Sequence, residues 1–247
     1  MKKSILLIIF LIFNLPTHSQ VIKTDSLQYK KNINYKSFII PTILIGYGIV
    51  GLESHTLKNI NTSAKNELNE HIDKTFTIDD ISQYTPFISV YTLNNLGIKG
   101  ENDLKNRTII LGTAYLIMGT TVNILKKTGN EIRPDGSSKN SFPSGHTATA
   151  FMGAEFLYQE YKNKSYWYGI SGYLIATTTG FFRMYNDRHW LTDITAGAGI
   201  GILSTKIAYW LHPVIKKIFF KDNRNINAMA LPFYNREASG LEVLITF

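Results

Sequence analysis

The sequence predicts an all-α protein, a helical bundle embedded in a membrane. Three stretches of eighteen residues contain no charged side chain, and they cover residues 81–98, 108–125 and 165–182. Tyrosine and tryptophan gather at the ends of the apolar runs, as in the aromatic belts at a membrane–water interface. The chain has 247 residues and no cysteine, which allows one bundle and excludes disulfides and thiolate metal sites.

The chain begins with the layout of a secretory signal. Lys2 and Lys3 precede an unbroken apolar run from Ile5 to Phe13, and the small residue Ser19 follows a proline. The run is short for a transmembrane helix, so we predict a signal peptide or an uncleaved signal anchor over residues 1–19. In either case the following chain starts outside the cytoplasm.

The remaining elements follow from the same apolar pattern. We predict a helical domain over residues 20–224, with a first apolar stretch at 38–52 and further helices at 147–161 and 190–212. The polar stretch 53–80 between them is expected to be helical around 63–73. Residues 225–247 form a C-terminal tail, in which GLEVLITF predicts one short strand.

One alternative architecture stays open. The apolar stretches are near the lower length limit for spanning, and the mean hydropathy of −0.05 is low for six spans. The buried helices of a soluble extracytoplasmic domain would produce a similar pattern.

The charge of the chain bears on its partners. The formal net charge is +8, which fits an anionic partner such as a lipid or a phosphate compound. The basic residues are scattered and no nucleic-acid recognition motif accompanies them, so we expect no nucleic-acid partner.

Three short clusters carry chemistry. In KKTGNEIRP, Lys126 and Arg133 are seven residues apart, which would place them on one face of a helix. In SFPSGHTATA, Ser144 is a good N-cap type before a helix that begins beside a histidine. In RMYNDRHWLTD, His189 and Asp193 are four residues apart, a spacing at which a carboxylate can orient an imidazole.

Together these clusters predict phosphoryl-transfer chemistry. Lys126, Arg133 and Arg183 are three cations, about the number needed to surround a phosphoryl group. His189 with Asp193 supplies a nucleophile, and His146 supplies a second group that titrates near neutral pH. Ser144, Gly145 and the helix start that follows supply hydrogen-bond donors. The clusters contain no metal-ligand set.

The three motifs KxxxxxxRP, PSGH and RxxxxxHxxxD resemble the signature of the type 2 phosphatidic acid phosphatase family, which shares its site with the vanadium haloperoxidases. All spacings match, the signature spans residues 126–193, and the surrounding helices at 38–212 look like the helical core of that family. The family usually has a serine before the arginine of the third motif. This chain has Phe182 there, which removes one expected hydrogen bond to phosphate.

The resemblance implies a mechanism and a set of roles. His189 attacks phosphorus and forms a phosphohistidine, while Asp193 orients its ring. His146 protonates the leaving oxygen and then activates water. The expected phosphate-binding residues are Lys126, Arg133, Ser144, Gly145 and Arg183. The resemblance implies no cofactor and no metal, because fixed cations do the work of an ion.

A lipid phosphate or diphosphate is the expected substrate, with lipid A or polyprenyl diphosphate preferred. The expected partners are this substrate and membrane lipids; the sequence makes no prediction of oligomeric state. Lysines and arginine at 162–164 and 216–224 lie away from the motifs and predict a cytoplasmic face there. The protein is thus expected in the inner membrane of a bacterial envelope with its site facing the periplasm. That orientation requires one apolar stretch before Lys126, with 81–98 the candidate, to lie in the membrane interface or to pack without crossing.

Two alternatives remain. A vanadate-dependent haloperoxidase would use the same pocket, although such proteins are usually large and soluble. A non-catalytic membrane protein that binds an anion or a lipid would need the cations alone and not an oriented nucleophile.

Overall fold

The computed structural model describes residues 35–69, 77–219, 227–234 and 239–246. The segment predicted as a signal peptide or anchor, residues 1–19, lies outside the described residues.

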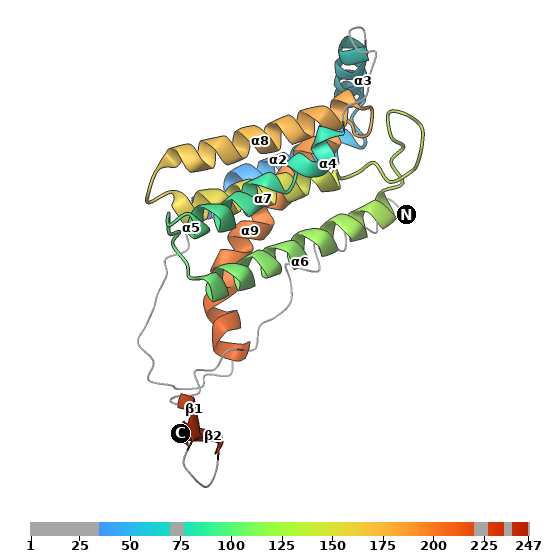
Figure 1. Cartoon of the computed structure of the whole chain (residues 1–247). Coiled ribbons are helices and arrows are strands. Elements are labelled where there is room, and N and C mark those ends of the chain that lie inside the picture. Colours follow the sequence, from blue (N-terminus) through green and yellow to red (C-terminus); the bar gives the residue numbers. More distant parts are fainter. Residues whose placement is uncertain (1–34, 70–76, 220–226, 235–238, 247) are drawn as a thin grey trace. The chain divides into compact units, whose positions relative to one another are not determined.

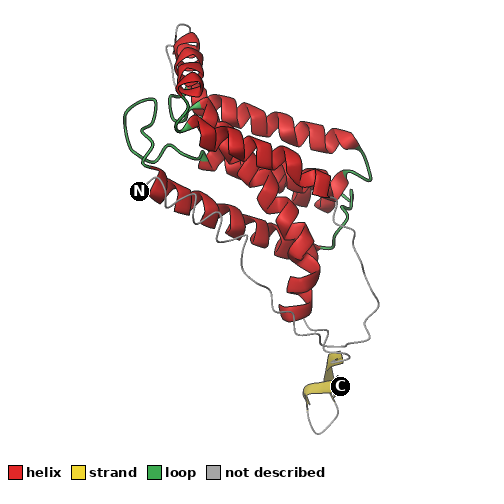
Figure 2. Ribbon diagram, turned by 180° about the vertical axis from the view of Figure 1, so that it is seen from behind, coloured by secondary structure: helices red, strands yellow, loops and turns green. Residues whose placement is uncertain are grey.

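The described chain is a helical bundle with a separate C-terminal hairpin (Figures 1 and 2). This confirms the predicted all-α class for the domain that carries the motifs. The elements in chain order are η1 (Tyr35–Phe38), α2 (Ile39–Gly51), α3 (His55–Asn69), α4 (Ile78–Ser82), α5 (Thr85–Asn95), α6 (Leu104–Gly129), α7 (Gly145–Tyr161), α8 (Tyr166–Tyr185), α9 (Leu191–Phe219), β1 (Asn227–Tyr234) and β2 (Ser239–Thr246).

Helix α7 is the centre of the bundle. Twelve of its residues are buried, and it packs against α5, α6, α8 and α9 (Figure 1). Small residues allow the backbones to come close: a Cβ at Gly201 of α9 would lie 2.2 Å from the carbonyl oxygen of Ala148. A helix buried on all sides shows little amphipathic pattern, which explains why α7 reads as a short apolar run in the sequence.

Helix α6 closes the core with one face. Its buried residues Ile110, Ala114, Met118 and Val122 recur every four positions, the spacing of one side of a helix. They join Met152 and Phe156 of α7 in the core cluster.

The directions of the helices bring the three motifs to one end of the bundle. The first motif lies where α6 ends, the second where α7 begins, and the third between α8 and α9. Two hydrogen bonds join the loops there: Trp190 Nε1 donates to the Ile132 carbonyl at 2.8 Å, and the Asp135 amide donates to the Asp187 carbonyl at 3.1 Å. This placement confirms the prediction of a site at one end.

The stretch 81–98 does not form one long helix. It is split between α4, which ends at Ser82, and α5, whose first turn contains Pro86. At 1.5 Å per residue an 11-residue helix such as α5 rises about 16 Å, short of a hydrocarbon layer of about 30 Å. This length agrees with the expectation that the stretch packs without crossing. The expected helix at 63–73 is instead α3, which begins eight residues earlier at His55.

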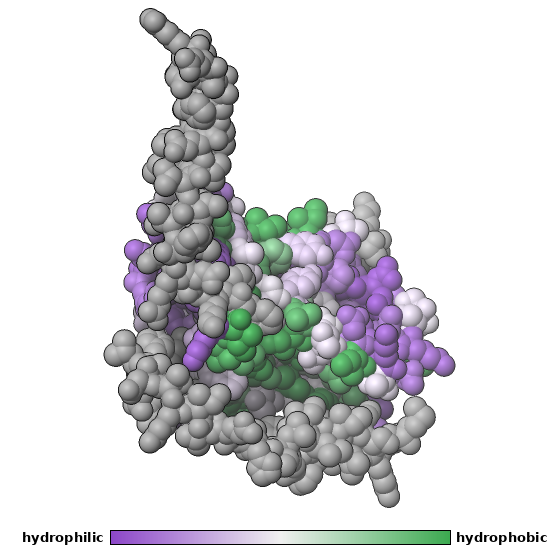
Figure 3. All heavy atoms as spheres, turned by 90° about the horizontal axis from the view of Figure 1, so that it is seen from below, coloured by the Kyte–Doolittle hydropathy of each residue, from purple (hydrophilic) through white to green (hydrophobic). Residues whose placement is uncertain are grey.

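Helix length and composition support only some of the membrane-spanning helices that the sequence predicts. Among the described residues, α6 alone is long and apolar enough to cross a membrane, and the sharply bent pair 35–51 and 55–68 adds a second span if it counts as one. Large apolar side chains are nevertheless exposed on several helices, and Figure 3 shows hydrophobic residues gathered beside a hydrophilic region on one face. Examples on α2, α6 and α8 are Ile40, Ile43, Leu116, Trp167 and Leu174.

The C-terminal tail forms a β-hairpin. Strand β2 confirms the strand predicted at the end of the chain, and it pairs antiparallel with β1 from Asn227 opposite Thr246 to Tyr234 opposite Ser239. Strand β1 was not predicted, because its sequence NAMALPFY contains a proline and lacks regular alternation.

Candidate active site

Asp193 joins the second and third motifs. It lies in the first turn of α9 with its side chain fully buried. Its Oδ2 accepts hydrogen bonds from Ser141 Oγ at 2.5 Å and from the Trp190 amide at 2.9 Å. Its own carbonyl accepts one from the Ser144 amide at 3.1 Å. The carboxylate therefore has a fixed orientation beside the start of α7.

His189 lies next to this carboxylate, as the sequence spacing predicts. Its Nδ1 is 3.7 Å from Asp193 Oδ2, which is within ion-pair range but longer than a hydrogen bond. The His189 side chain is 2% exposed and the Asp193 side chain is 0% exposed. Such catalytic contacts are often long without substrate. Burial lowers the pKa of His189 to about 4, with Asp193 opposing the shift and Lys126 and Arg183 adding to it. The ring is therefore neutral at pH 7, as a nucleophile must be.

A polar cavity of about 370 Å³ lies at the same end of the bundle, and we call it the anion pocket; neither His189 nor Asp193 belongs to its wall. Residues from all three motifs contribute to its walls, together with the short helix α4. The residues that matter for its chemistry are Asp79, Asp80, Arg133, His146, Arg183 and Arg188.

Two arginines with buried Nε atoms make the pocket suitable for an anion. The Nε atoms of Arg133 and Arg183 are buried and have no hydrogen-bond partner among the described residues. Burial lowers the pKa of Arg133, and repulsion from Arg183 lowers it further. An oxyanion between these groups would satisfy the unpaired donors and relieve the repulsion.

The loop after α6 places Arg133, and this corrects one expectation. Lys126 and Arg133 do not share a helix face, because α6 ends at Gly129 and Asn130 adopts a left-handed conformation with φ of 48°. Arg133 then lies in a turn in which its amide donates to Ser138 and its carbonyl accepts from Gly136. Lys126 donates through Nζ to the Asn140 carbonyl at 2.6 Å and is not part of the pocket wall.

Ser144 and Gly145 lie at the N-terminus of α7. The Ser144 side chain is fully buried, caps the helix at the Thr147 amide and pairs with Thr147 Oγ1 at 2.9 Å. A Cβ at Gly145 would lie 3.9 Å from Lys126 Cε, so the first and second motifs are in contact. Phosphate binding by these two residues stays a prediction, and the observed role of Ser144 is capping.

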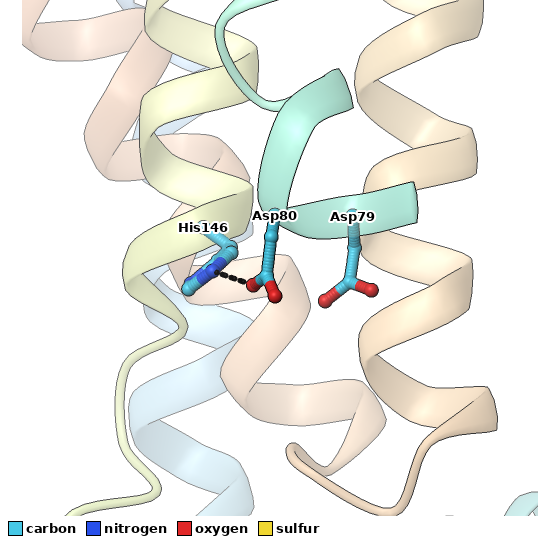
Figure 4. A group of neighbouring side chains, drawn as sticks. All are labelled: Asp79, Asp80 and His146. Carbon is cyan, nitrogen blue, oxygen red and sulfur yellow. Dashed lines mark hydrogen bonds and ion pairs between the residues drawn. The ribbon is translucent and has the colours of Figure 1, made fainter. Parts of the chain in front are cut away.

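Helix α4 adds two carboxylates that sequence reasoning missed. Asp79 Oδ2 lies 2.5 Å from Arg183 Nη1, and Asp79 Oδ1 accepts from Asn186 Nδ2 at 3.2 Å. Asp80 Oδ1 lies 2.8 Å from His146 Nε2, and Figure 4 shows these two side chains directed at each other. The sequence does place two acidic residues directly before an apolar stretch. Their spacing from the three motifs, however, does not indicate that they lie beside them. Ser141, the partner of Asp193, was missed in the same way.

The same carboxylates raise the question of a metal. Among the described residues, Asp79, Asp80 and His146 form a group whose ligand atoms lie within 4.8 Å of one another (Figure 4). Arg183 already provides the cation for this group, because its Nη1 lies 2.5 Å from Asp79 and 3.9 Å from Asp80. Arginines 133 and 188 line the same cavity. A divalent ion there would be repelled, so we assign no metal to it.

Phe182 replaces the serine that is usual before the third-motif arginine. Its ring packs edge-on against Phe181 and Tyr185, with centroids 5.8 Å and 5.9 Å away. It does not belong to the wall of the anion pocket. The substitution therefore removes a hydroxyl without placing a ring in the cavity.

Comparison with known proteins matches the motif-bearing part of the chain. Residues 107–217, which contain all three motifs, match the family model of the PAP2 superfamily. The Lipid A 1-phosphatase of Porphyromonas gingivalis is 31% identical over 243 residues, 92% of this chain and 53% of that protein. The Bacitracin transport permease protein BcrC of Bacillus licheniformis is 31% identical over 108 residues, 44% of this chain and 48% of that protein. The chain thus spans about half the length of these curated relatives.

Two solved structures resemble the fold. The crystal structure of Aquifex aeolicus LpxE has a TM-score of 0.48 at 24% identity and covers 61% of this chain and 95% of its own. The PAP2 type phosphatidylglycerolphosphate phosphatase from Bacillus subtilis has a TM-score of 0.49 at 18% identity, with 72% and 98% covered.

Proposed function

We propose that the chain is a metal-independent phosphatase that acts on a lipid phosphate or diphosphate, because residues 107–217 match the family model of the PAP2 superfamily. The observation that carries the proposal is the neutral, buried His189 beside Asp193, at the same end of the bundle as a pocket where Arg133 and Arg183 each have a buried, unpaired Nε donor. A nucleophile, an orienting carboxylate and an anion site together are what phosphoryl transfer to a side chain requires.

The proposed reaction has two steps. His189 attacks phosphorus in line and forms a phosphohistidine, while the bond from phosphorus to the leaving oxygen breaks. His146 transfers its proton to that oxygen. Water then attacks the phosphohistidine, gives a proton to His146 and releases phosphate. Arg133 and Arg183 of the pocket wall stabilise the charge on the equatorial oxygens throughout, and Lys126 would join them only by leaving the Asn140 carbonyl.

A groove beside the anion pocket supports a lipid substrate. It has a volume of about 530 Å³, lies between α4–α5, α7 and α8, and shares Asp80 with the anion pocket. Its walls are mainly hydrocarbon and include Ile81, Tyr84, Ile88, Leu157 and Ile175. An apolar chain in this groove would place its phosphate near Arg183. The similarity to a relative named Lipid A 1-phosphatase over 92% of this chain favours lipid A, with polyprenyl diphosphate as the second candidate.

We place the protein in the inner membrane of a bacterial envelope, with its site toward the periplasm. Two observations support this placement. Large apolar side chains on α6 and α8 are exposed, including Leu116 at 71% and Leu174 at 67%. An extensive exposed apolar surface is unfavourable in water. The opposite end of the bundle carries Lys162, Lys164, Lys216 and Lys217, as expected for a cytoplasmic face.

The test is phosphate release by the purified full chain from a lipid panel. The panel contains lipid A, polyprenyl diphosphate, phosphatidylglycerol phosphate and phosphatidate, all in EDTA. We expect release from lipid A, inhibition by vanadate, which mimics the phosphorus transition state, and no oxidation of bromide when vanadate and peroxide are supplied. Loss of activity in EDTA that is restored by Zn²⁺ or Mg²⁺ would contradict the metal-independent scheme. Bromide oxidation without phosphate release would identify a haloperoxidase.

A further inference from the structure

Asp80 is the partner of the histidine that must carry the proton. Its Oδ1 lies 2.8 Å from His146 Nε2, whereas the orienting carboxylate of the third motif serves His189 (Figure 4). We infer that Asp80 is a positioning residue that aligns His146 and favours its protonated form as the general acid. The inference rests on the proposed phosphatase function.

The backbone of Asp80 is held from two sides. The neighbouring Asp79 forms a buried ion pair with Arg183, and Ser82 Oγ is 2.7 Å from Thr179 Oγ1 of α8. At the C-cap of α4, Gln83 Nε2 donates to the Asp80 carbonyl at 3.0 Å. These contacts hold the short helix α4 against α8, so the carboxylate is presented to His146 at a fixed place.

The two histidines need opposite protonation states. His189 must be neutral to attack, and burial ensures this. His146 must carry a proton, yet burial and the nearby Arg183 lower its pKa, and only the carboxylates of Asp80 and Asp79 raise it. Arg133 and Arg188 face the same cavity and disfavour a further positive charge. Asp80, the carboxylate in contact with the ring, is therefore the main group that opposes this lowering and favours the imidazolium.

The proton balance is complete with groups already present. In the proposed state without substrate, His146 is protonated at Nε2 and donates to Asp80 Oδ1, the atom 2.8 Å away. When substrate enters, the leaving oxygen accepts this proton and His146 becomes neutral, while Asp80 stays ionised. The Asp80 side chain is 59% exposed, so it has room to turn away from Nε2 at that moment.

The test is Asp80→Asn, which keeps the size and one oxygen acceptor but removes the charge. The panel lipid with the highest wild-type turnover serves as substrate. We expect kcat at pH 7 to fall about tenfold. The pH at which kcat declines on the alkaline side should also drop by about one unit, because a tenfold change corresponds to one pKa unit, or about 1.4 kcal/mol. KM should stay level or fall, because a charge that repels phosphate is gone. Asp80→Glu should restore the wild-type pH dependence of kcat on the alkaline side.

The matched control is Asp103→Asn. Asp103 caps α6 at the other end of the bundle, and asparagine is an equally good N-cap. If Asp80→Asn behaves like this control at every pH, or raises kcat while it lowers KM, the inference is wrong. A uniform loss of kcat that Asp80→Glu does not restore would show a merely structural role. Failure of the wild type to release phosphate from any lipid would instead overturn the proposed function itself.

Discussion

Arg183 and Asp79 form a buried ion pair across 104 residues of sequence. The Nη1 and Oδ2 atoms lie 2.5 Å apart, and the two side chains are 9% and 2% exposed. The pair fixes the guanidinium of the third motif and fastens α4 to the end of α8. The arginine that the motif supplies therefore has its orientation set by a helix outside the motif.

Removing this carboxylate should weaken both the fold and the phosphate site. Asp79→Asn leaves a buried guanidinium without its counter-charge, which typically costs about 3 kcal/mol. We expect a clear drop in the thermal unfolding midpoint in detergent and a KM several-fold higher.

The control is Asp135→Asn, which breaks a partly exposed pair with Arg188 at 3.2 Å. Solvent screening makes such a pair worth less than about 1 kcal/mol. Equal effects of the two variants would show that the buried pair has no special role.

His189→Ala should abolish turnover and prevent formation of a phosphoenzyme. The reason is that, among the histidines in the described part of the chain, His189 is the one that combines a neutral buried ring with an orienting carboxylate, Asp193. The measurement is rapid acid-free quenching with radiolabelled substrate, followed by a search for acid-labile phosphate on the protein. His212→Ala is the control; this histidine bonds Asn106 at the far end of α6 and should leave labelling intact. Labelled phosphate on another residue in His189→Ala would refute the assignment.

The buried His189 should also make stability fall in acid. The pKa of His189 is lowered in the folded protein to about 4 from 6.5, so the unfolded chain binds more protons between these values. The stability contribution is therefore complete above pH 6.5 and is lost as the pH falls toward 4. Between pH 7 and pH 4.5 we expect the wild type to lose about 2 to 3 kcal/mol more than His189→Gln. Urea titration in detergent at both pH values measures the difference.

The control for this experiment is His55→Gln, which removes an exposed imidazole at the start of α3. It should show the same pH dependence as the wild type. An equal loss for the wild type and His189→Gln would mean that His189 does not titrate as described.

Single cysteines can test which way the site faces, because the native chain has none. Ser137 is exposed in the loop of the first motif, and Asn163 is exposed at the opposite end of α7. In intact spheroplasts, an impermeant thiol reagent should label Ser137→Cys but not Asn163→Cys. The reverse pattern would place the site in the cytoplasm and remove periplasmic lipids from the substrate list. Labelling of both would favour a soluble extracytoplasmic domain.

The helices that carry the motifs could be predicted closely because each is marked by local signals. Ser144 caps α7, and charge-free stretches outline α6 and α8 to within about four residues at each end. The expected helix face shared by Lys126 and Arg133 was wrong, since a left-handed Asn130 ends α6 between them. Asparagine adopts that conformation only in some contexts, so its presence alone does not mark a helix end.

By itself, the sequence determined the helical class, the strand at the end of the chain and the pairing of His189 with Asp193. Each of these depends on residues a few positions apart, where helix and strand periodicity already limit the geometry. Only the tertiary structure decided that Asp79 holds Arg183, that Asp80 faces His146 and that Ser141 fixes Asp193. These contacts join residues 52 to 104 positions apart, and they exist because the packing of α4, α7, α8 and α9 brings their ends together. No local spacing encodes that packing.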